Sequence, residues 1–414
     1  MKVFKFGGAS VKSAQNIENV AKIIRSFPGE KIIIVVSAMG STTDALEDIL
    51  DAYHAGHDHT TKLNEVKAYH AGIAASLFPK ESNAPALIAA ACDETSAALK
   101  NKSDHDIVYD QVVSQGEIIS SLMLYHYLAS QGISSSWQDA RDYIATDTTH
   151  REGKINWPVT EQNMQKIPTL FGSYDVIITQ GFIGRSPVGF TTTLGREGSD
   201  FTAAIFASCL NAVSLTVWKD VPGLMNADPK RLPDAVVLKE LPYSEAAEMM
   251  YYGANLIHTK TIRPLANKNI PLLVKSFIDP SLPGSRIHDC HIDQLPVMYV
   301  FKDDQCLVSV KGKDYAFISE QHLQEIFTML NALQIRFNMV QHSAISFSFC
   351  FDHHHEKLQQ LLSRLKPGFE VYYNLNLTLI TIKNYTPAVY EEYRHKKDIL
   401  MEQSSRSTLQ VLLK

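Results

Sequence analysis

The sequence predicts an α/β protein with a mainly parallel central sheet, followed by a smaller α+β region of ferredoxin-like modules. Residues 2–6 alternate like a strand and 31–36 repeat the strand pattern, and each stretch leads into a glycine-containing turn and then into an amphipathic helical pattern. Repeated alternation of strand, loop and helix is typical of a parallel sheet with helices on its faces. After about residue 290 the order changes to strand, helix, strand, strand, helix, strand, which is the ferredoxin-like order.

The length of the chain predicts more than one domain. With 414 residues it exceeds the size at which a single hydrophobic core keeps growing. Segment 279–289 is rich in Pro, Gly and Asp, so we place the main boundary near residue 290 and expect a larger domain at 1–290. Residues 291–414 are expected to hold a complete module at 305–373 and a shortened second copy at 375–414, with separate strands at 369–374 and 377–384.

Apolar spacing predicts the other elements of the larger domain in order. Residues 60–131 have largely helical spacing, and 108–132 is the longest helical pattern among them. Strands are expected at 132–137, 174–184, 212–223 and 271–277, and helices at 244–253 and 258–268.

Charge and composition exclude several classes of partner. A net charge of -5 and a pI near 6.3 argue against nucleic acid or an anionic membrane as the main partner. The fully apolar run at 32–36 is far too short to span a bilayer. The five cysteines are scattered without a CxxC pair, and the chain opens directly into strand and turn chemistry without a secretory pattern. We therefore expect reduced thiols and a cytoplasmic protein.

The stretch TTTLGREGSD at 191–200 is the main candidate for a binding site. It lies between the strand expected at 174–184 and the helical pattern that follows, with Ser199 or Asp200 expected to cap that helix. A strand, a polar glycine loop and a helix N-terminus together favour anion binding, and Arg196 adds a guanidinium suited to carboxylate or phosphate. Taken alone, the loop is more simply an ordinary βα turn.

Other chemistry-bearing residues stand at the ends of the expected strands. Lys5 precedes Gly7 and Gly8, where an ammonium can neutralise charge that develops during phosphoryl transfer. Glu117 at the start of a helical segment is suited to pair with a substrate ammonium. Singly, these are also explained as a surface lysine and a helix-dipole carboxylate. The same double interpretation, as ligand contact or as cap and turn residue, applies to Ser37, Thr43, Asp220 and Asp228.

Six segments resemble one family when taken together. KFGGAS, VVSAMGSTTDAL, SQGEIISS, TTTLGREGSD, VWKDVPGLMNADP and YYGANLIHTKTI stand in the order found in aspartate kinases of the amino-acid kinase superfamily. The resemblance covers roughly residues 1–290, and the tail is similar, more loosely, to a tandem ACT-type regulatory region. It implies an amino-acid-kinase-like three-layer sandwich. It also implies transfer of the ATP γ-phosphoryl group, with Mg²⁺, to the β-carboxylate of L-aspartate, giving 4-phospho-L-aspartate and ADP at the entry to lysine, threonine and methionine synthesis.

The resemblance also implies a role for each matching residue. Lys5 would stabilise the transferring phosphoryl group, and Asp200 would hold Lys5 and the substrate amine in place. Arg196 would clamp the α-carboxylate and Glu117 the ammonium, with Thr43, Phe182 and Ser199 completing the aspartate pocket. The nucleotide side would comprise Lys5, Gly7, Gly8, Ser10, Ser37, Lys219, Asp220, Met225, Lys230 and Asn255. No general base is required, because the attacking carboxylate is already ionised near neutral pH.

Several positions depart from the family pattern. On the nucleotide side these are Ala9, Lys219, Met225, Lys230, Asn255 and Thr259. We expect Lys219 or Lys230 to supply the charge that Asn255 lacks. In the tail, Asn338 stands where lysine-inhibited members carry an aspartate that meets the effector ammonium. Because an amide holds an ammonium less strongly than a carboxylate does, we expect weak or absent lysine inhibition, with threonine or no effector as the alternatives.

Two other functions are compatible with parts of the sequence, and a third is not expected. The chain is alternatively a superfamily kinase for glutamate derivatives, carbamate or a nucleotide, or an effector sensor that binds without turnover. A fusion to a dehydrogenase is not expected from the chain length. We expect a homodimer formed through the tail, or a higher homo-oligomer. No resident metal site is expected, because adjacent histidines at 353–355, and those at 54, 57 and 59, lack supporting ligands.

Overall fold

The computed structural model describes residues 1–414 except 102, 255–256, 258 and 314–315. The chain divides into two compact units. The first comprises Met1–Leu224, Val237–Ala247 and Leu256–His291, and the second Met225–Val236, Glu248–Asn255 and Ile292–Lys414. Residues 225–236 and 248–255 thus belong to the second unit, although they precede residue 290 in the chain.

The first unit is built on an eight-stranded sheet in the order β3-β4-β2-β1-β7-β9-β10-β8. Its strands pair in parallel except where β9 meets β10, so the predicted mainly parallel sheet is confirmed. A separate hairpin pairs β5 with β6. The strands are β1 Lys2–Phe6, β2 Ile32–Val36, β3 Ser135–Gln138, β4 Val176–Gln180, β5 Ile183–Arg185, β6 Thr191–Thr193, β7 Ser214–Lys219, β8 Glu240–Pro242, β9 Leu272–Ser276 and β10 Ser285–His288.

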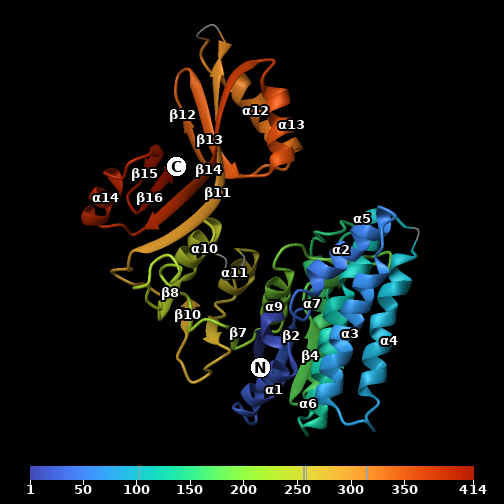
Figure 1. Ribbon diagram of the computed structural model, residues 1–414. Coiled ribbons are helices and arrows are strands. Elements are labelled where there is room, and N and C mark those ends of the chain that lie inside the picture. The colour runs from blue at the N-terminus through green and yellow to red at the C-terminus, as the bar shows by residue number, and fades with distance from the viewer. Residues whose placement is uncertain (102, 255–256, 258, 314–315) are drawn as a thin grey trace. The chain divides into compact units, whose positions relative to one another are not determined.

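Helices cover both faces of this sheet, which gives the three layers expected (Figure 1). Helix α6 packs on β2, β3 and β4, whereas α9 packs on β1, β2 and β7. The helices are α1 Ala14–Arg25, α2 Thr42–His54, α3 Thr60–Leu77, α4 Ala84–Leu99, α5 His105–Val113, α6 Gln115–Ser130, α7 Trp157–Met164, α8 Ile167–Leu170, α9 Gly198–Cys209, α10 Tyr243–Tyr251 and α11 Thr259–Ala266, with the 3-10 turns η1 Gly8–Val11 and η2 Ala140–Asp142.

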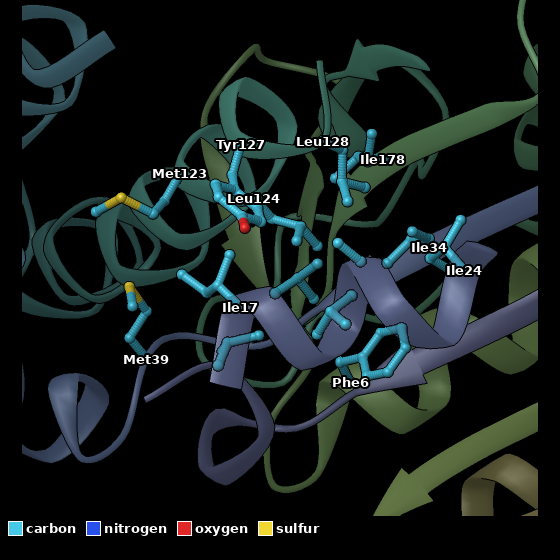
Figure 2. Packing of buried hydrophobic residues seen from close by; sticks show 14 of the residues in the cluster. Phe6, Ile17, Ile24, Ile34, Met39, Met123, Leu124, Tyr127, Leu128 and Ile178 are labelled. Carbon is cyan, nitrogen blue, oxygen red and sulfur yellow. The ribbon is translucent and has the colours of Figure 1, made fainter. Parts of the chain in front are cut away.

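The main core of the first unit lies between the sheet and helices α1 and α6. Figure 2 shows Ile17 and Ile24 of α1 packed with Leu124 of α6, and with Phe6 and Ile34 of the sheet. Successive side chains of a strand point to opposite faces, and Phe4, Phe6 and Trp218 all belong to this core. Lys5 of β1 and Lys219 of β7 therefore point to the opposite face, on which α9 lies.

The helical pattern at 108–132 was predicted as one segment, and this is wrong. Helix α5 ends at Val113 and α6 begins at Gln115. The pattern runs through the break because apolar residues on both sides are buried. At Gly116 a side chain would place its Cβ only 2.8 Å from the Cβ of Ala38, so the glycine lets α6 begin against the loop that follows β2.

The second unit contains a six-stranded antiparallel sheet in the order β12-β13-β11-β14-β16-β15. Helices α12 and α13 share a hydrophobic core with β11 and β13, while α14 packs with β14 and β16. The order β11, α12, β12, β13, α13, β14 confirms the predicted ferredoxin-like module. The elements are β11 Met298–Gly312, α12 Glu320–Ala332, β12 Phe337–His342, β13 Ser346–Asp352, α13 His355–Leu365, β14 Phe369–Lys383, α14 Pro387–Arg394, β15 Ile399–Ser404 and β16 Thr408–Leu413.

Separate strands at 369–374 and 377–384 were predicted, and this is wrong because both belong to β14. Strands β11 and β14 are each 15 residues long and pair along their length, with register shifts near Asp304 and Asn376. Both residues have left-handed φ values, 51° and 56°, so the chain bends there without leaving the sheet. The first half of β11 thereby gives the second copy a strand that its own sequence lacks.

Two further observations bear on the environment of the chain. All five cysteines are free thiols. No helix in the described part of the chain has the length and apolar character needed to cross a bilayer.

Candidate functional site

The topology of the eight-stranded sheet indicates where a ligand binds. After β1 the chain continues to β2 on one side, whereas after β7 it continues to β8, β9 and β10, which all lie on the other side. The switch point of the sheet thus lies between β1 and β7. In open α/β sheets, ligands bind in the crevice at such a point, beyond the carboxyl ends of the strands. The residues that directly follow β1, β2, β4 and β7 are Gly7, Ser37, Gly181 and Asp220.

A buried cluster of charges lies at this switch point. The Nζ of Lys5 is 2.6 Å from Oδ1 of Asp200, and the Nζ of Lys219 is 4.0 Å from Oδ2. The side chains of Lys5 and Asp200 are only 10% and 3% exposed. Burial lowers the pKa of Lys219 below its usual value, and the Asp200 carboxylate acts in the opposite direction. Two ammonium groups thus lie at the edge where an anionic ligand would bind. Asp200 lies between them, and the carboxylates of Glu197 and Asp220 also act on Lys219.

Asp200 owes its place to an early start of helix α9. Ser199 or Asp200 was predicted to cap this helix, and this is wrong: the N-cap residue is Glu197, with a left-handed φ of 54° and no side-chain cap hydrogen bond. The helix begins at Gly198, where a Cβ would lie 2.7 Å from the ring of Phe182. Since Asp200 is inside the first turn, its carboxylate is available to Lys5 rather than to the helix backbone.

Gly7 and Gly8, which follow β1, leave the backbone without side chains at the edge of the sheet where a ligand is expected. A Cβ at Gly7 would lie 3.4 Å from Nζ of Lys5. A Cβ at Gly8 would lie 2.6 Å from the carbonyl oxygen of Ala38 and 2.8 Å from that of Gly40, which no side chain tolerates. The buried hydroxyl of Ser10 donates to the carbonyl of Trp218 at 3.4 Å. The turns after β1 and β2 therefore lie against each other without intervening side chains.

A cavity of about 540 Å³ opens next to this edge. Six of the residues predicted to form the site line it: Ser37, Thr43, Glu117, Phe182, Arg196 and Ser199. Phe182 follows β4 with a left-handed φ of 69°, and its N–H donates to the hydroxyl of Thr202 at 2.9 Å. Residues that are separated in the chain by up to 162 positions, from Ser37 to Ser199, thus share one cavity.

Glu117 is the buried carboxyl of this cavity. It is 3% exposed, and its Oε1 accepts the N–H of Ala38 at 3.1 Å. Within the described structure its Oε2 has no hydrogen-bond partner. Burial raises the pKa of Glu117 to about 8, against the effect of the Ala38 N–H and the Lys5 ammonium. A buried carboxyl with a free oxygen is suited to bind a cationic group of a ligand.

The cavity also has lining residues that the sequence analysis missed. The guanidinium of Arg151 lies over the ring of Tyr109, 4.1 Å from its centroid, and the hydroxyl of Tyr109 donates to Glu47. Glu47 is one helical turn after Thr43, which was a usable signal. Arg151 stands in a segment without a recognisable motif. The other missed residues are Asp44, Glu152, Gly195, Glu197 and Gly198.

The remaining predicted residues are not brought to this cavity. Asp220 is exposed just beyond β7. Met225 and Lys230 belong to the second unit, and Asn255 lies outside the described residues. Their roles stay predictions. Among the residues that the structure describes, no group of three or more His, Cys, Asp or Glu side chains is arranged to hold a metal ion.

Comparison with known proteins places this geometry in context. A family model described as the Amino acid kinase family matches residues 1–276. The crystal structure of E. coli aspartokinase III in complex with aspartate and ADP (R-state) is 26% identical, with a TM-score of 0.86 over 100% of this chain and 96% of that chain.

Curated relatives add similarity at the sequence level. A bifunctional aspartokinase/homoserine dehydrogenase 1 from Arabidopsis thaliana is 30% identical over 364 residues, which are 84% of this chain and 40% of that protein. The lysine-sensitive aspartokinase 3 of E. coli is 29% identical over 84% of this chain and 78% of its own length. The chain thus spans about 40% of the length of the bifunctional relatives.

Proposed function

Since this chain belongs to the amino acid kinase family, we propose that it is an aspartate kinase, which transfers the γ-phosphoryl group of ATP to the β-carboxylate of L-aspartate. The products are 4-phospho-L-aspartate and ADP, at the entry to lysine, threonine and methionine synthesis. The observation that carries the proposal is the Lys5–Asp200 pair at the switch point of the sheet, beside a cavity lined by Glu117 and Arg196.

The cavity offers a complementary group for each charge of aspartate. Arg196 binds the α-carboxylate through two parallel hydrogen bonds, which suits a planar guanidinium better than a lysine. Glu117 binds the ammonium through Oε2, which has no hydrogen-bond partner among the described residues. Thr43, Phe182 and Ser199 complete the pocket. Because Arg196 and Glu117 hold the other end of the substrate, the β-carboxylate faces Lys5 and Lys219 at the switch point.

Transfer needs positioning and neutralisation of charge more than acid–base chemistry. An oxygen of the β-carboxylate attacks the γ-phosphorus, and the bond to the bridging oxygen of ADP breaks as the new bond forms. Lys5 stabilises the charge on the transferring group, and Asp200 holds Lys5 in place. Because the attacking oxygen is already ionised, no proton has to be removed from it.

The nucleotide lies against the turns that follow β1 and β7 in this proposal. The backbone at Gly7 and Gly8 is open to close approach by phosphates, and Lys219 adds a cation. Magnesium bound with the nucleotide would neutralise phosphate charge. It needs only one or two carboxylates in addition to phosphate oxygens and water. Asp220 is the carboxylate nearest in sequence to Lys219 for that contact.

Regulation and assembly are proposed on the second unit. We propose an amino-acid effector at its six-stranded sheet, with lysine inhibition weak or absent. A homodimer would form through this sheet, whose outer strands β12 and β15 each leave one edge available. The free cysteines fit a cytoplasmic location.

An ATP-dependent hydroxamate assay tests the function. Hydroxylamine traps the acyl phosphate as aspartyl hydroxamate, so the purified chain should form it from L-aspartate, ATP and magnesium, with ADP in equal amount. L-glutamate, carbamate and UMP serve as alternative acceptors. Binding of ATP and aspartate without hydroxamate or ADP would show a sensor rather than an enzyme, and turnover with another acceptor would show a different kinase.

A further inference from the structure

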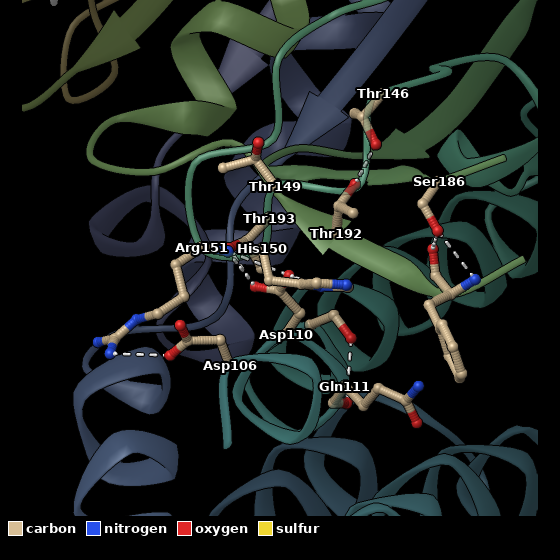
Figure 3. A network of polar contacts seen from close by, with 12 residues as sticks. Asp106, Asp110, Gln111, Thr146, Thr149, His150, Arg151, Ser186, Thr192 and Thr193 are labelled. Carbon is tan, nitrogen blue, oxygen red and sulfur yellow. Dashed lines mark hydrogen bonds and ion pairs between the residues drawn. The ribbon is translucent and has the colours of Figure 1, made fainter. Parts of the chain in front are cut away.

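A buried carboxylate outside the predicted site, Asp110, contacts both the loop that carries Arg151 and strand β6 (Figure 3). Asp110 of α5 is fully buried. Its Oδ1 accepts the hydroxyl of Thr193 at 2.6 Å, and both of its oxygens lie 3.1 Å from the backbone N of Arg151. The Nδ1 of His150 lies 2.7 Å from Oδ2. Thr193 ends β6, three residues before Arg196, so Asp110 holds both arginine-bearing segments.

The two segments also contact each other directly. The N–H of Gly153 donates to the carbonyl of Thr193 at 2.8 Å. At Gly195 a Cβ would lie 3.1 Å from Cγ of Glu152 and 3.4 Å from the carbonyl oxygen of Arg151. The loop at 150–153 therefore runs along the turn at 194–197. Asp110 binds both segments, through the N–H of Arg151 and the hydroxyl of Thr193.

Arg151 and Arg196 are the cationic side chains that line the cavity of about 540 Å³. Asp44, Glu47, Glu117, Glu152 and Glu197 line it as well. A substrate with two carboxylates would be repelled by the ionised members of this set, so each guanidinium has a large effect on its binding. The Arg151 guanidinium lies on the Tyr109 ring and is 3.6 Å from Oδ1 of Asp106. These two contacts orient the Arg151 side chain.

We propose that Arg151 is a second guanidinium that contacts the α-carboxylate of the substrate, opposite Arg196. Asp110 is then a positioning residue, which sets the spacing of the two guanidinium groups through Thr193 and the N–H of Arg151. This inference rests on the proposed function, because it assigns the acidic substrate to this cavity. The inference explains why the carboxylate of Asp110 occupies a fully buried position, where an apolar side chain would otherwise be expected.

The first test replaces the guanidinium. Arg151→Met should raise the KM for L-aspartate about tenfold or more and leave the KM for ATP within about twofold, since a charged hydrogen bond to the substrate is lost. Arg151→Lys should recover part of that loss, because a point charge lacks the planar fork. Arg185→Met is the matched control: Arg185 is similarly exposed, at 44% against 48%, and pairs with Asp142 at 3.2 Å outside this cavity. It should leave both KM values unchanged.

The second test addresses the positioning role of Asp110 and leaves its buried carboxylate in place. Thr193→Val removes the hydroxyl that binds Asp110 but keeps the shape of the side chain, whereas Thr193→Ser keeps the hydroxyl. The valine variant should raise the KM for aspartate several-fold with little change in kcat, and the serine variant should stay close to the original protein. An equal loss of kcat and folded protein without a change in KM would show a merely structural role and overturn the inference.

The outcomes separate this inference from the proposed function. If the unaltered chain forms no aspartyl hydroxamate, the proposed function fails. If it turns over normally and Arg151→Met has the same KM for aspartate as Arg185→Met, only the inference fails.

Discussion

The ammonium of Lys5 lies 2.6 Å from the carboxylate of Asp200, on the face of the sheet that carries α9 rather than the aromatic core. This pair connects the end of β1 to the first turn of α9 across the switch point. Because Lys219 lies 4.0 Å from the other oxygen, Asp200 is shared between two cations. The cluster therefore brings two ammonium groups to the ligand-binding edge of the sheet, as well as holding two elements together.

We predict that the ion pair serves activity more than stability. Asp200→Asn and Lys5→Met should each lower kcat by about a hundredfold or more, by analogy with loss of one preorganised charge-stabilising group. Each should also destabilise the fold by about 3–5 kcal/mol, because a buried charge loses its partner. The double variant Lys5→Met/Asp200→Leu should regain most of the stability but no activity. Thermal unfolding and the hydroxamate rate measure the two effects, and an active double variant would contradict the proposed role.

We predict a pH-dependent affinity for aspartate that depends on Glu117. Its pKa is raised to about 8 by burial, so the free protein holds it mainly protonated at neutral pH. The substrate ammonium binds the ionised form, so the KM for aspartate should fall about tenfold per unit as pH rises below that pKa, and level off above it. Initial rates across this range check the slope. Glu117→Gln should bind weakly with no such slope, and a slope retained in this variant would assign the effect to another group.

The raised pKa of Glu117 also predicts how stability depends on pH. The predicted dependence has the opposite sign from that of most carboxylates, whose pKa is lowered on folding. Between its ordinary value of 4.5 and about 8, Glu117 holds its proton in the folded state and loses it in the unfolded state. Stability from this group is therefore present at low pH and is lost as pH rises through that window. Glu117→Gln should unfold at a temperature that varies less with pH over the same window. Calorimetry of both proteins, without aspartate, measures the difference.

The sequence predicted the first unit well because local patterns determine it. Apolar runs, glycine turns and helical spacing gave the parallel sheet, and the residues after β1, β2 and β4 meet because parallel strands end at one edge. The side to which Lys5 points follows from the alternation of Phe4 and Phe6 alone. Cap positions were less predictable: α9 starts before Ser199 because Gly198 fits under Phe182, a contact between residues far apart in the chain.

The polar network around Asp110 could not be predicted for the same reason. Asp110, Arg151 and Thr193 come from a helix, a loop and a hairpin strand, and no spacing in the chain connects them. The sequence also did not reveal that β11 and β14 are each shared between two modules. A strand that belongs to two modules carries the same alternation as two strands in succession, so only the pairing of distant residues distinguishes them.

We predict that Lys219 contributes to nucleotide binding. Its side chain is 23% exposed and already faces Asp200, so it adds positive charge where phosphates would lie. Lys219→Ala should raise the apparent KM for ATP about tenfold and leave the KM for aspartate nearly unchanged. Lys230→Ala tests the second cation that the sequence suggested, at an exposed position in the second unit. If neither variant changes the affinity for ATP, the proposed rearrangement of the nucleotide contacts is wrong.

Insensitivity to lysine is the prediction that depends on the second unit. Asn338 of β12 stands at the position that the resemblance to lysine-inhibited kinases assigns to the effector ammonium. Its Oδ1 already accepts the ammonium of Lys302 at 2.7 Å, and its Nδ2 donates to Gln305 and Asp352 at 2.8 and 2.9 Å. Burial acts to raise the pKa of Asp352, but the hydrogen bond from Gln305 and the Lys302 ammonium outweigh it, so the pKa lies below its usual value. The chain thus supplies its own ammonium to this cluster.

We therefore expect millimolar L-lysine to leave the rate of hydroxamate formation unchanged. Lys302→Ala should remove the internal ammonium and leave the amide oxygen of Asn338 and the carboxylate of Asp352 open, so this variant should bind L-lysine measurably by calorimetry. Lys311→Ala is the control, because Lys311 is on the same strand but lies over the ring of Tyr372 at 5.4 Å instead. Inhibition of the unaltered protein by micromolar lysine would contradict the expectation, since a free ammonium would then have to displace or bypass Lys302 at no measurable cost.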